Sequence, residues 1–233
     1  MKKKESPTLN FRIHIGVFYT LMMAKLGFVK RDKIEFAKRG VTEADITVTE
    51  NLLTEFSEIP TDDELLGLQI NATKDKDKKS DVLRASISEV IDRAANKYGN
   101  NSGYYRQFGV NSLSGIDGGE LSTAARRVRR VGSNMATELA SEGLTPEMLA
   151  TLKKDTENYD IALATSEDAN SKREIATEDR IEKANAIYTI MSKYCGKGKQ
   201  IWVSVNEAKF NDYVIYDTPS GTKDETTPPA PPK

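Results

Sequence analysis

Apolar residues recur at steps of three and four over much of the chain, a spacing that predicts amphipathic helices. The segment 80–99, SDVLRASISEVIDRAANKYG, shows this pattern most clearly, and we expect its helix to end at Gly99. The predicted buried face consists of Leu83, Ile87, Val90, Ile91, Ala94 and Tyr98. Four further segments should form helices or buried elements: 11–29, 42–59, 62–79 and 121–142.

Two capping boxes mark predicted helix starts. In this motif an N-cap threonine accepts the N–H of the third helical residue, whose carboxylate accepts the N–H of the cap. Thr42 with Asp45 and Thr61 with Glu64 have the required spacing. The helix that begins after Thr61 either runs through its charged second half or restarts at Ser80.

The longest predicted element covers residues 146–195. An N-cap, a first-turn proline and a first-turn acid occur in order at Thr145, Pro146 and Glu147. Steps of three and four hold throughout, with apolar residues at both ends and polar residues, among them Arg173 and Arg180, in the middle. Two architectures fit: one helix of about 50 residues, about 75 Å long, or a hairpin that turns within residues 166–174. The absence of internal Gly and Pro favours the single helix, in which buried arginines would need partners.

The segment 192–202, SKYCGKGKQIW, is the most enzyme-like string in the chain. A phosphate-binding loop of the type G-x-x-x-x-G-K-[ST] lies between a strand and a helix, whose first N–H groups hold the phosphate. Here the glycines follow a predicted helix, and no Ser or Thr follows the Gly-Lys pairs. We therefore expect a helix stop at Cys195-Gly196, where Lys197 and Lys199 suit the negative helix end.

The residues after this stop combine strand-like composition with aromatic side chains. Residues 200–205, QIWVSV, resemble a strand, and the segment 200–217 should dock on the helices. Its aromatic anchors and candidate partner-binding residues are Trp202, Phe210, Tyr213 and Tyr216. The alternative is an exposed edge that pairs with a partner. Residues 218–233 lack large apolar side chains and should form a disordered Pro-rich tail.

A glycine-rich segment, residues 99–119, separates two predicted helices. Within it only residues 104–110, YYRQFGV, have a composition compatible with regular structure. We expect Tyr104, Tyr105 and Phe108 to pin this loop to the helices. Loops longer than about twelve residues are usually functional or mobile, so this loop would hold the site if the chain were an enzyme.

The composition favours an all-α fold. The chain has 233 residues, of which 30% are charged and 7% aromatic, a balance typical of helices with solvated faces. We predict a helical bundle of about five or six helices over residues 11–217, preceded by a flexible tail, residues 1–10. Because the net charge is only -1, binding to nucleic acid or to an anionic membrane would require a local patch.

The clearest basic patch lies in the segment ARRVRRV. Its candidate partner-binding residues are Arg126, Arg127, Arg129 and Arg130. Three of them, at positions 126, 129 and 130, share a helix face. Such a cluster can hold phosphates, although charge runs on helices usually form a solvated, ion-paired face. The sequence leaves open an ion-paired face, an acidic protein partner and nucleic acid.

No motif for catalysis, a cofactor or a metal is present, and we predict no such site residues. His14, the only histidine, lies beside Ile13 and Ile15 and should pack in the core or make a polar contact; a multi-histidine metal site is excluded. Cys195, the only cysteine, excludes a disulfide framework. It lies near a helix C-terminus, which does not favour a thiolate, so it should be buried and inert.

The N-terminal segment fits neither a signal peptide nor a membrane span. Three lysines precede the apolar run, but Arg12 and His14 interrupt it, Lys25 ends it, and no A-x-A site follows. A spanning helix would need about twenty nearly uncharged residues. We expect no membrane span and favour a cytoplasmic or particle-associated location.

Residues 149–217 carry a resemblance. RIEKANAIYTIMSKYCGKGKQIW and AKFNDYVIYD are similar to the C-terminal halves of uncharacterised helical-bundle proteins from gut-associated anaerobic bacteria. The resemblance covers under a third of the chain and includes no catalytic motif. It implies a helical fold in a bacterial protein, and no assigned activity.

These observations predict a non-enzymatic structural or protein-interaction module that assembles with itself or scaffolds other proteins. A component of a cell envelope or of a phage particle would be one setting. One alternative is a nucleic-acid-associated protein that uses the helix with residues 126–130. A second is an enzyme with its site at the loop 99–119.

Overall fold

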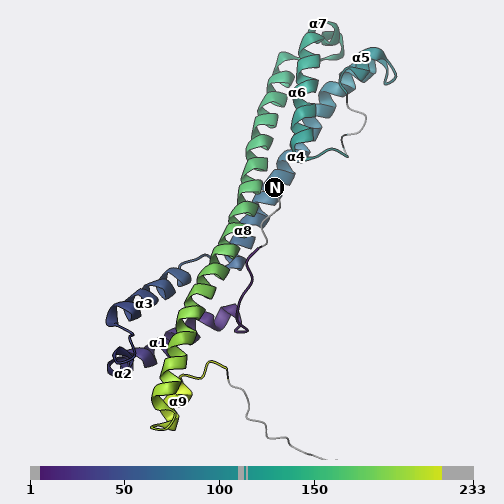
Figure 1. Ribbon diagram of the computed structural model, residues 1–233. Coiled ribbons are helices and arrows are strands. Elements are labelled where there is room, and N and C mark those ends of the chain that lie inside the picture. The colour runs from purple at the N-terminus through teal and green to yellow at the C-terminus, as the bar shows by residue number, and fades with distance from the viewer. Residues whose placement is uncertain (1–5, 110–112, 114, 217–233) are drawn as a thin grey trace, which may run out of the picture. The chain divides into compact units, whose positions relative to one another are not determined.

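The computed structural model describes residues 6–109, 113 and 115–216, and these residues form helices with no strand among them (Figure 1). The elements are α1 (Ile15–Arg31), α2 (Lys33–Ala37), α3 (Glu43–Ser57), α4 (Asp62–Tyr98), α5 (Gly103–Arg106), α6 (Gly118–Asn134), α7 (Ala136–Leu139), the 3-10 helix η1 (Ala140–Glu142), α8 (Pro146–Trp202) and α9 (Glu207–Asp212). The predicted all-α class is confirmed. The predicted tail 218–233 lies outside the described residues.

The chain divides into two compact units. The first is formed within residues 1–59 and 178–233, and the second by residues 60–177. The apolar pattern predicts one bundle over residues 11–217, whereas the described residues form two separate apolar cores. Helix α8 contributes its last turns to the first unit and its first turns to the second.

The first unit packs α1 and α3 against the last turns of α8. Phe18, Met22 and Leu26 recur every four residues on α1 and are fully buried, as the apolar pattern of residues 11–29 predicts. The Phe18 ring lies 5.4 Å from the ring of Phe56 on α3. Across the core, α8 supplies a buried stripe of Ala184, Ile187, Met191, Tyr194 and Cys195.

The second unit packs α4, α6 and the first turns of α8. Five members of the predicted stripe on residues 80–99 are buried, and Tyr98 is partly buried. Gly132 brings the backbone of α6 close to its neighbours: a Cβ atom there would lie 3.1 Å from side-chain atoms of Val90 and Leu149. The absence of a side chain at Gly132 thus lets the three helices pack closely.

Local signals in the sequence place most helix starts correctly. Both predicted capping boxes are present, with the N–H of Thr42 donating to the Asp45 carboxylate at 2.8 Å and that of Thr61 donating to Glu64 at 2.5 Å. Helix α4 runs through Ser80 without a break and ends at Gly99, whose φ of 74° suits glycine.

Helix α8 is a single helix of 57 residues, so the hairpin alternative is excluded. The polar middle of its packing face has partners on α4, and the arginine there is half-buried. Arg173 donates two hydrogen bonds of 2.9 Å to the carboxylate of Asp62 and one of 3.0 Å to Gln69. Ser166 lies 3.5 Å from Thr73, hydroxyl to hydroxyl. Polar pairs thus replace apolar packing along this stretch.

The predicted helix stop at Cys195-Gly196 is wrong, because α8 continues to Trp202. Gly198 is buried within the helix, and a Cβ atom there would overlap the ring of Tyr213. The glycine therefore serves close packing of the segment after α8. A Cβ atom at Gly196 would meet nothing within 4 Å, and the structure shows no reason for glycine there.

The strand-like segment 200–205 is not a strand. Its first residues finish α8, residues 203–205 form a turn, and Asn206 caps α9 by accepting the N–H of Lys209 at 3.0 Å. The alternative of an exposed edge that pairs with a partner strand is therefore excluded for residues 200–205. Local β-propensity was overridden by the helix that precedes it and by the packing of Tyr213.

Two further helical predictions need correction. The expected helix over residues 121–142 is divided into α6, α7 and η1, with a break at Met135, where ψ is 15°. Within the loop 99–119, Ser102 caps the short helix α5. Phe108 is buried as predicted, whereas Tyr104 is exposed and stacks on Tyr98 at 4.7 Å. Residues 110–112 and 114 lie outside the described part.

The two glycines near the end of α8 give a matched prediction. Gly198→Ala should lower the free energy of unfolding of the first unit by about 2 kcal/mol, because the new methyl group displaces the Tyr213 ring. Gly196→Ala should raise it by up to about 1 kcal/mol, because glycine is unfavourable inside a helix and the added methyl group has room. Urea unfolding followed by Trp202 fluorescence measures both, and equal effects of the two substitutions would contradict this packing.

Candidate functional site

The four aromatic residues proposed for partner binding do not form one exposed surface. Tyr213 is fully buried, Trp202 and Phe210 are half-buried, and Tyr216 is 42% exposed. The ring of Tyr213 lies 5.6 Å from that of Phe36 and 6.3 Å from that of Phe28. The docking of this segment on the helices is therefore confirmed, with Tyr213 as the main anchor.

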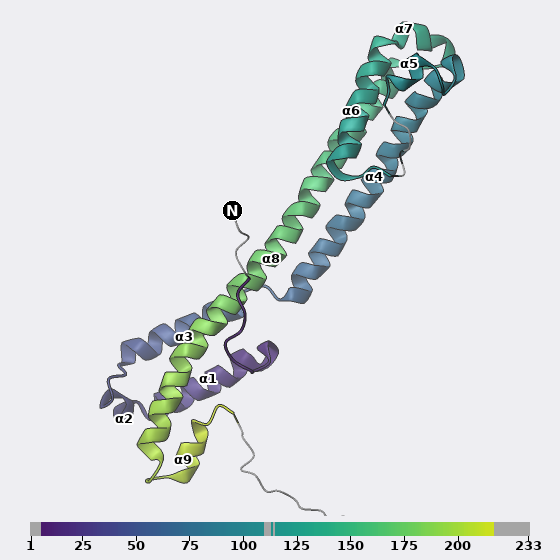
Figure 2. The ribbon, with the colours of Figure 1, turned by 45° about the vertical axis from the view of Figure 1, so that its right-hand side comes forward.

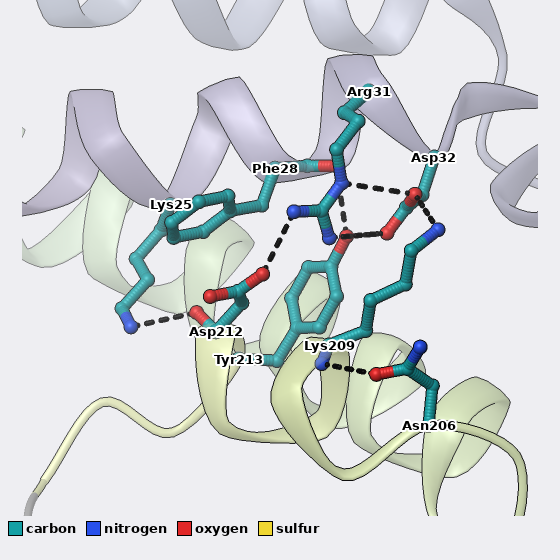
Figure 3. A network of polar contacts seen from close by, with 8 residues as sticks. All are labelled: Lys25, Phe28, Arg31, Asp32, Asn206, Lys209, Asp212 and Tyr213. Carbon is teal, nitrogen blue, oxygen red and sulfur yellow. Dashed lines mark hydrogen bonds and ion pairs between the residues drawn. The ribbon is translucent and has the colours of Figure 1, made fainter.

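Asp32 is the centre of a polar network that joins α1 to α9 (Figure 3). Its side chain is only 3% exposed and lies between the end of α1 and the start of α2. Its carboxylate accepts hydrogen bonds from Arg31 Nη2 at 2.8 Å, Lys209 Nζ at 2.8 Å and the Tyr213 hydroxyl at 2.9 Å. The Tyr213 hydroxyl also lies 2.8 Å from the carbonyl oxygen of Phe28, so its single proton is shared between two acceptors.

Three additional contacts connect the residues around Asp32. Lys25 is buried and donates to the carbonyl oxygen of Asp212 at 2.6 Å. This contact places a positive charge at the C-terminal end of α9, where the helix dipole favours it. Arg31 Nη1 bonds the Asp212 carboxylate at 2.8 Å, so its guanidinium bridges Asp32 and Asp212. The ammonium of Lys209 lies 4.0 Å from the centre of the Trp202 ring, a cation–π distance.

The network fixes the charge state of its members. Burial alone would raise the pKa of Asp32, but hydrogen bonds from Arg31, Lys209 and Tyr213 outweigh burial and hold that pKa well below its usual range. Burial, followed by the hydrogen bond to Asp32, raises the pKa of Tyr213 far above its usual range. Asp32 therefore stays ionised and Tyr213 stays neutral across the physiological pH range. Neither group titrates near neutral pH, and their contacts dock α9 on α1.

Of the four arginines on α6, two contact other described residues of the chain and two do not. Arg126 forms an ion pair with Asp160 of α8, and Arg127 donates to the carbonyl oxygen of Gly109 at 3.0 Å. Arg129 and Arg130 form no ion pair or hydrogen bond with the described residues. The ion-paired-face interpretation thus applies to Arg126, and only two of the four arginines remain available to a partner.

A surface that the sequence analysis did not single out is the open stretch, which we define as residues 62–79 of α4 and 167–177 of α8. None of these residues is buried, whereas Ser80, directly after the first segment, and Ser166, directly before the second, are buried. Figure 2 shows the reason: α6 lies along the other half of the α4–α8 pair, and no third helix of this unit covers the open stretch. The apolar core of the unit includes no member of either segment.

Two of the hollows on the described part of the chain have defined linings. The larger, about 560 Å³, is an open groove lined by Gly40, Val41, Asp45, Ile190, Lys193, Tyr194, Gly196, Lys197 and Gln200. The smaller, about 140 Å³, lies between α4 and the start of α8, and Ser86, Glu89, Glu147, Met148 and Thr151 line it. Neither of these two hollows is lined by the loop 99–119.

The two single-copy residues have structural positions. His14 is exposed rather than packed in the core, and its Nδ1 accepts the N–H of Gly16 at 3.2 Å as the N-cap of α1. Cys195 is buried as predicted, and burial raises the pKa of its thiol to about 11. Among the described residues, no three His, Cys, Asp or Glu side chains gather as metal ligands would.

The comparisons with known proteins provide no family assignment: no protein-family model, no curated protein and no solved structure matches the chain. The resemblance to helical-bundle proteins of gut-associated anaerobic bacteria therefore stays an expectation. None of the described helices combines the length and the apolar character that a membrane span requires. Any account of function has to rest on the surfaces described above.

The Asp32 network predicts a pH-dependent stability of the first unit. The pKa of Asp32 is lower in the folded chain than in the unfolded chain, where an aspartate has a pKa of about 4. Ionised Asp32 therefore stabilises the fold fully above about pH 4, and this contribution to the free energy of unfolding is lost as the pH falls from about 4 toward the folded-state pKa. Asp32→Asn should lower the unfolding free energy by about 2 kcal/mol at pH 7, and the difference from the parent chain should shrink toward pH 3. Urea unfolding followed by Trp202 fluorescence measures both.

Glu43→Gln is the matched control, because the ion pair of Glu43 with Lys33 is exposed. Its effect should stay within about 0.5 kcal/mol at every pH. An Asp32→Asn chain as stable as its parent at pH 7 would show that the network does not hold α9 in place.

Proposed function

We propose that this chain is a non-enzymatic structural module that associates with a second copy of itself through the open stretch of α4 and α8. The observation that carries the proposal is the absence of any buried residue over residues 62–79 and 167–177. Two helices alone cover only one side of each other, and helical bundles bury their remaining faces against further helices. A second α4–α8 pair would supply them.

The side chains of the open stretch suit a helical partner. On α4, Leu65, Leu66 and Ala72 are only half-buried, and Leu68 is 62% exposed; on α8, Ile175 is 56% exposed. Single exposed apolar residues are ordinary. A run of them on a helix pair that lacks a covering layer is typical of a protein–protein contact.

The charges favour a second copy as the partner. The contacts Arg173–Asp62 and Ser166–Thr73 show which levels of the two antiparallel helices lie side by side. At one level the acidic start of α4, residues 62–64, lies opposite basic residues 172–173; Lys74, next to Thr73, lies within about one helical turn of the level of acidic residues 167–168. A two-fold axis along the helices would place α4 of each copy beside α8 of the other at matching levels.

Several of these charges are free to pair with a second copy. Lys74, Lys78 and Lys79 on α4 and Glu167 on α8 form no ion pair with any described residue. In the arrangement above, Lys74 of each copy would lie within reach of Glu167 of the other copy. Pairing of exposed charges adds little affinity but fixes orientation and excludes other partners.

The predicted alternative of an enzyme at the loop 99–119 has less support. The described part of the loop contains the short helix α5, and its aromatic residues pack on α4 or lie exposed. Burial places Cys195 away from solvent, and His14 serves as a helix cap. No described cluster has the nucleophile, base and oxyanion donor that group transfer requires.

Binding of nucleic acid remains the second candidate function, favoured by Arg129 and Arg130. Their guanidinium groups have no partner among the described residues, on a helix that also carries Arg126 and Arg127. Two free arginines supply a small phosphate-binding patch. The internal contacts of the other two arginines make this patch weaker than the sequence suggests.

Self-association is tested by a double substitution in the open stretch. Leu68→Asn with Ile175→Asn should weaken the dimer at least about tenfold, because two central apolar contacts are lost. Both side chains are exposed, so the unfolding free energy should change by less than about 0.5 kcal/mol per site. Sedimentation equilibrium over a range of protein concentrations measures the dissociation constant.

The matched control is Ile34→Asn with Val48→Asn, two exposed apolar residues of the first unit at 71% and 57% exposure. This control should dimerise like the parent chain. A parent chain that stays monomeric at all concentrations would refute self-association, and equal weakening by both double substitutions would show that the open stretch is not the contact.

The second candidate is tested with Arg129→Glu and Arg130→Glu. If nucleic acid binds here, the parent chain should bind a short duplex in low salt, lose affinity steeply as salt rises, and lose it on the double substitution. Fluorescence anisotropy with a labelled duplex measures this. Lys153→Glu with Lys154→Glu on α8 is the control of equal charge change, and a parent chain without salt-sensitive binding rules out this candidate.

A further inference from the structure

A non-helical arm, residues 6–14, lies along the last half of α8 within the first unit (Figure 2). Its side chains alternate near α1: Phe11 and Ile13 are buried, whereas Arg12 is exposed. The same alternation of polar and apolar residues is visible in the sequence TLNFRIH. The sequence predicts a flexible tail over residues 1–10; Thr8 and Asn10 of this segment bond to Asn185, and residues 1–5 lie outside the described part.

Asn185 of α8 holds the arm by its backbone. The Oδ1 atom accepts the N–H of Asn10 at 2.9 Å, and the Nδ2 atom donates to the carbonyl oxygen of Thr8 at 2.8 Å. One side-chain amide thus satisfies a donor and an acceptor two residues apart in the main chain. Because both bonds go to main-chain atoms, Asn185 recognises the path of the arm and not the identity of residues 8 and 10.

Phe11 provides the side-chain recognition. Its ring lies 4.7 Å from that of Phe18 and 4.8 Å from that of Tyr188. The hydroxyl of Tyr188 lies 3.2 Å from the hydroxyl of Tyr216, which in turn accepts the N–H of Arg12 at 3.1 Å. We name Asn185, Tyr188 and Tyr216 the arm clasp. It recognises an aromatic residue flanked by free main-chain N–H groups, with an aliphatic residue two positions later.

We propose that the arm clasp is a peptide-binding site that exchanges its own arm for the arm of a second copy. Exchange replaces every arm contact by the identical contact, so it costs only the freedom that two chains lose on association. The arm joins α1 at His14, whose backbone is already non-helical with ψ of 131°, so redirection of the arm there breaks no helical turn. This contact uses no residue of the open stretch and adds a second route to assembly.

Two full-length variants test the exchange by complementation. The clasp variant, Asn185→Ala, keeps an intact arm; the arm variant, Phe11→Ala with Ile13→Ala, keeps an intact clasp. Both also carry Leu68→Asn and Ile175→Asn, so that the weakened open stretch contributes equally to the mixed dimer and to the self-association of each variant. With different dyes on the two chains, energy transfer should report a mixed dimer at least about tenfold tighter than the self-association of either variant.

A mixture that associates no better than the separate variants would overturn the proposal. Failure of the open-stretch proposal would leave this result unchanged, because the relevant side chains are already replaced. The synthetic peptide SPTLNFRIH provides a second test with the arm variant, whose clasp is intact. Saturable binding of the peptide supports the clasp as a peptide-binding site. An arm variant that has the helix content of the parent chain and does not bind the peptide overturns the proposal.

A measurement on the parent chain covers the case in which the arm variant loses its helical structure. Hydrogen exchange of the Asn10 and Arg12 amides should proceed through an opening that leaves the α1 amides protected, since exchange of arms requires the arm to detach alone. Arm amides that exchange only together with those of α1 would show that the arm cannot leave the folded unit, and would overturn the proposal.

Discussion

Both apolar cores of this protein are built on one helix, and the unbroken hydrogen-bond ladder of α8 is therefore the constraint on which the other elements depend. Leu152 and Tyr159 are fully buried in the second unit, and Ile187 and Met191 in the first. No proline interrupts the helix after its first residue. A break in the ladder would remove the packing face from at least one core, because neither core has another helix in that position.

Each unit adds a buried tyrosine that bonds to an aspartate at a helix end. Tyr213 donates to Asp32, between α1 and α2, and Tyr159 donates to Asp117, the residue before α6, at 3.0 Å. Burial and the aspartate raise the pKa of Tyr159 to about 12. Such bonds contribute modest net stability, but a buried partner left without its bond is costly. They therefore fix where the short elements pack on the long helices.

The sequence predicts the elements governed by local rules and misses those governed by distant contacts. Capping boxes at Thr42 and Thr61 and the stop at Gly99 follow from neighbouring residues, and all three are present. The predicted stop at Cys195-Gly196 is wrong because α8 continues to Trp202, and the glycine at 198 makes room for the ring of Tyr213, fifteen residues away, whose docking no local pattern reveals.

Charged residues at the candidate sites show the same limit. Asp32 and Lys25 belong to no sequence motif. Their partners Lys209 and Asp212 lie in α9, more than 170 residues later in the chain. The four arginines of α6 look equivalent in sequence, yet Asp160 and the carbonyl of Gly109 engage two of them. In contrast, the alternation around Phe11 is a readable signal that a helix-based interpretation overlooked, because a period of two was not expected in an all-α chain.

The proposed self-association rests on the absence of buried residues in the open stretch, where no further helix of the second unit covers the α4–α8 pair. Hydrogen–deuterium exchange of the parent chain at low and high protein concentration tests this claim most directly. The account predicts that amides of residues 62–79 and 167–177 exchange more slowly at high concentration, while those of α3 do not change. Exchange rates in the open stretch that are independent of concentration would contradict it.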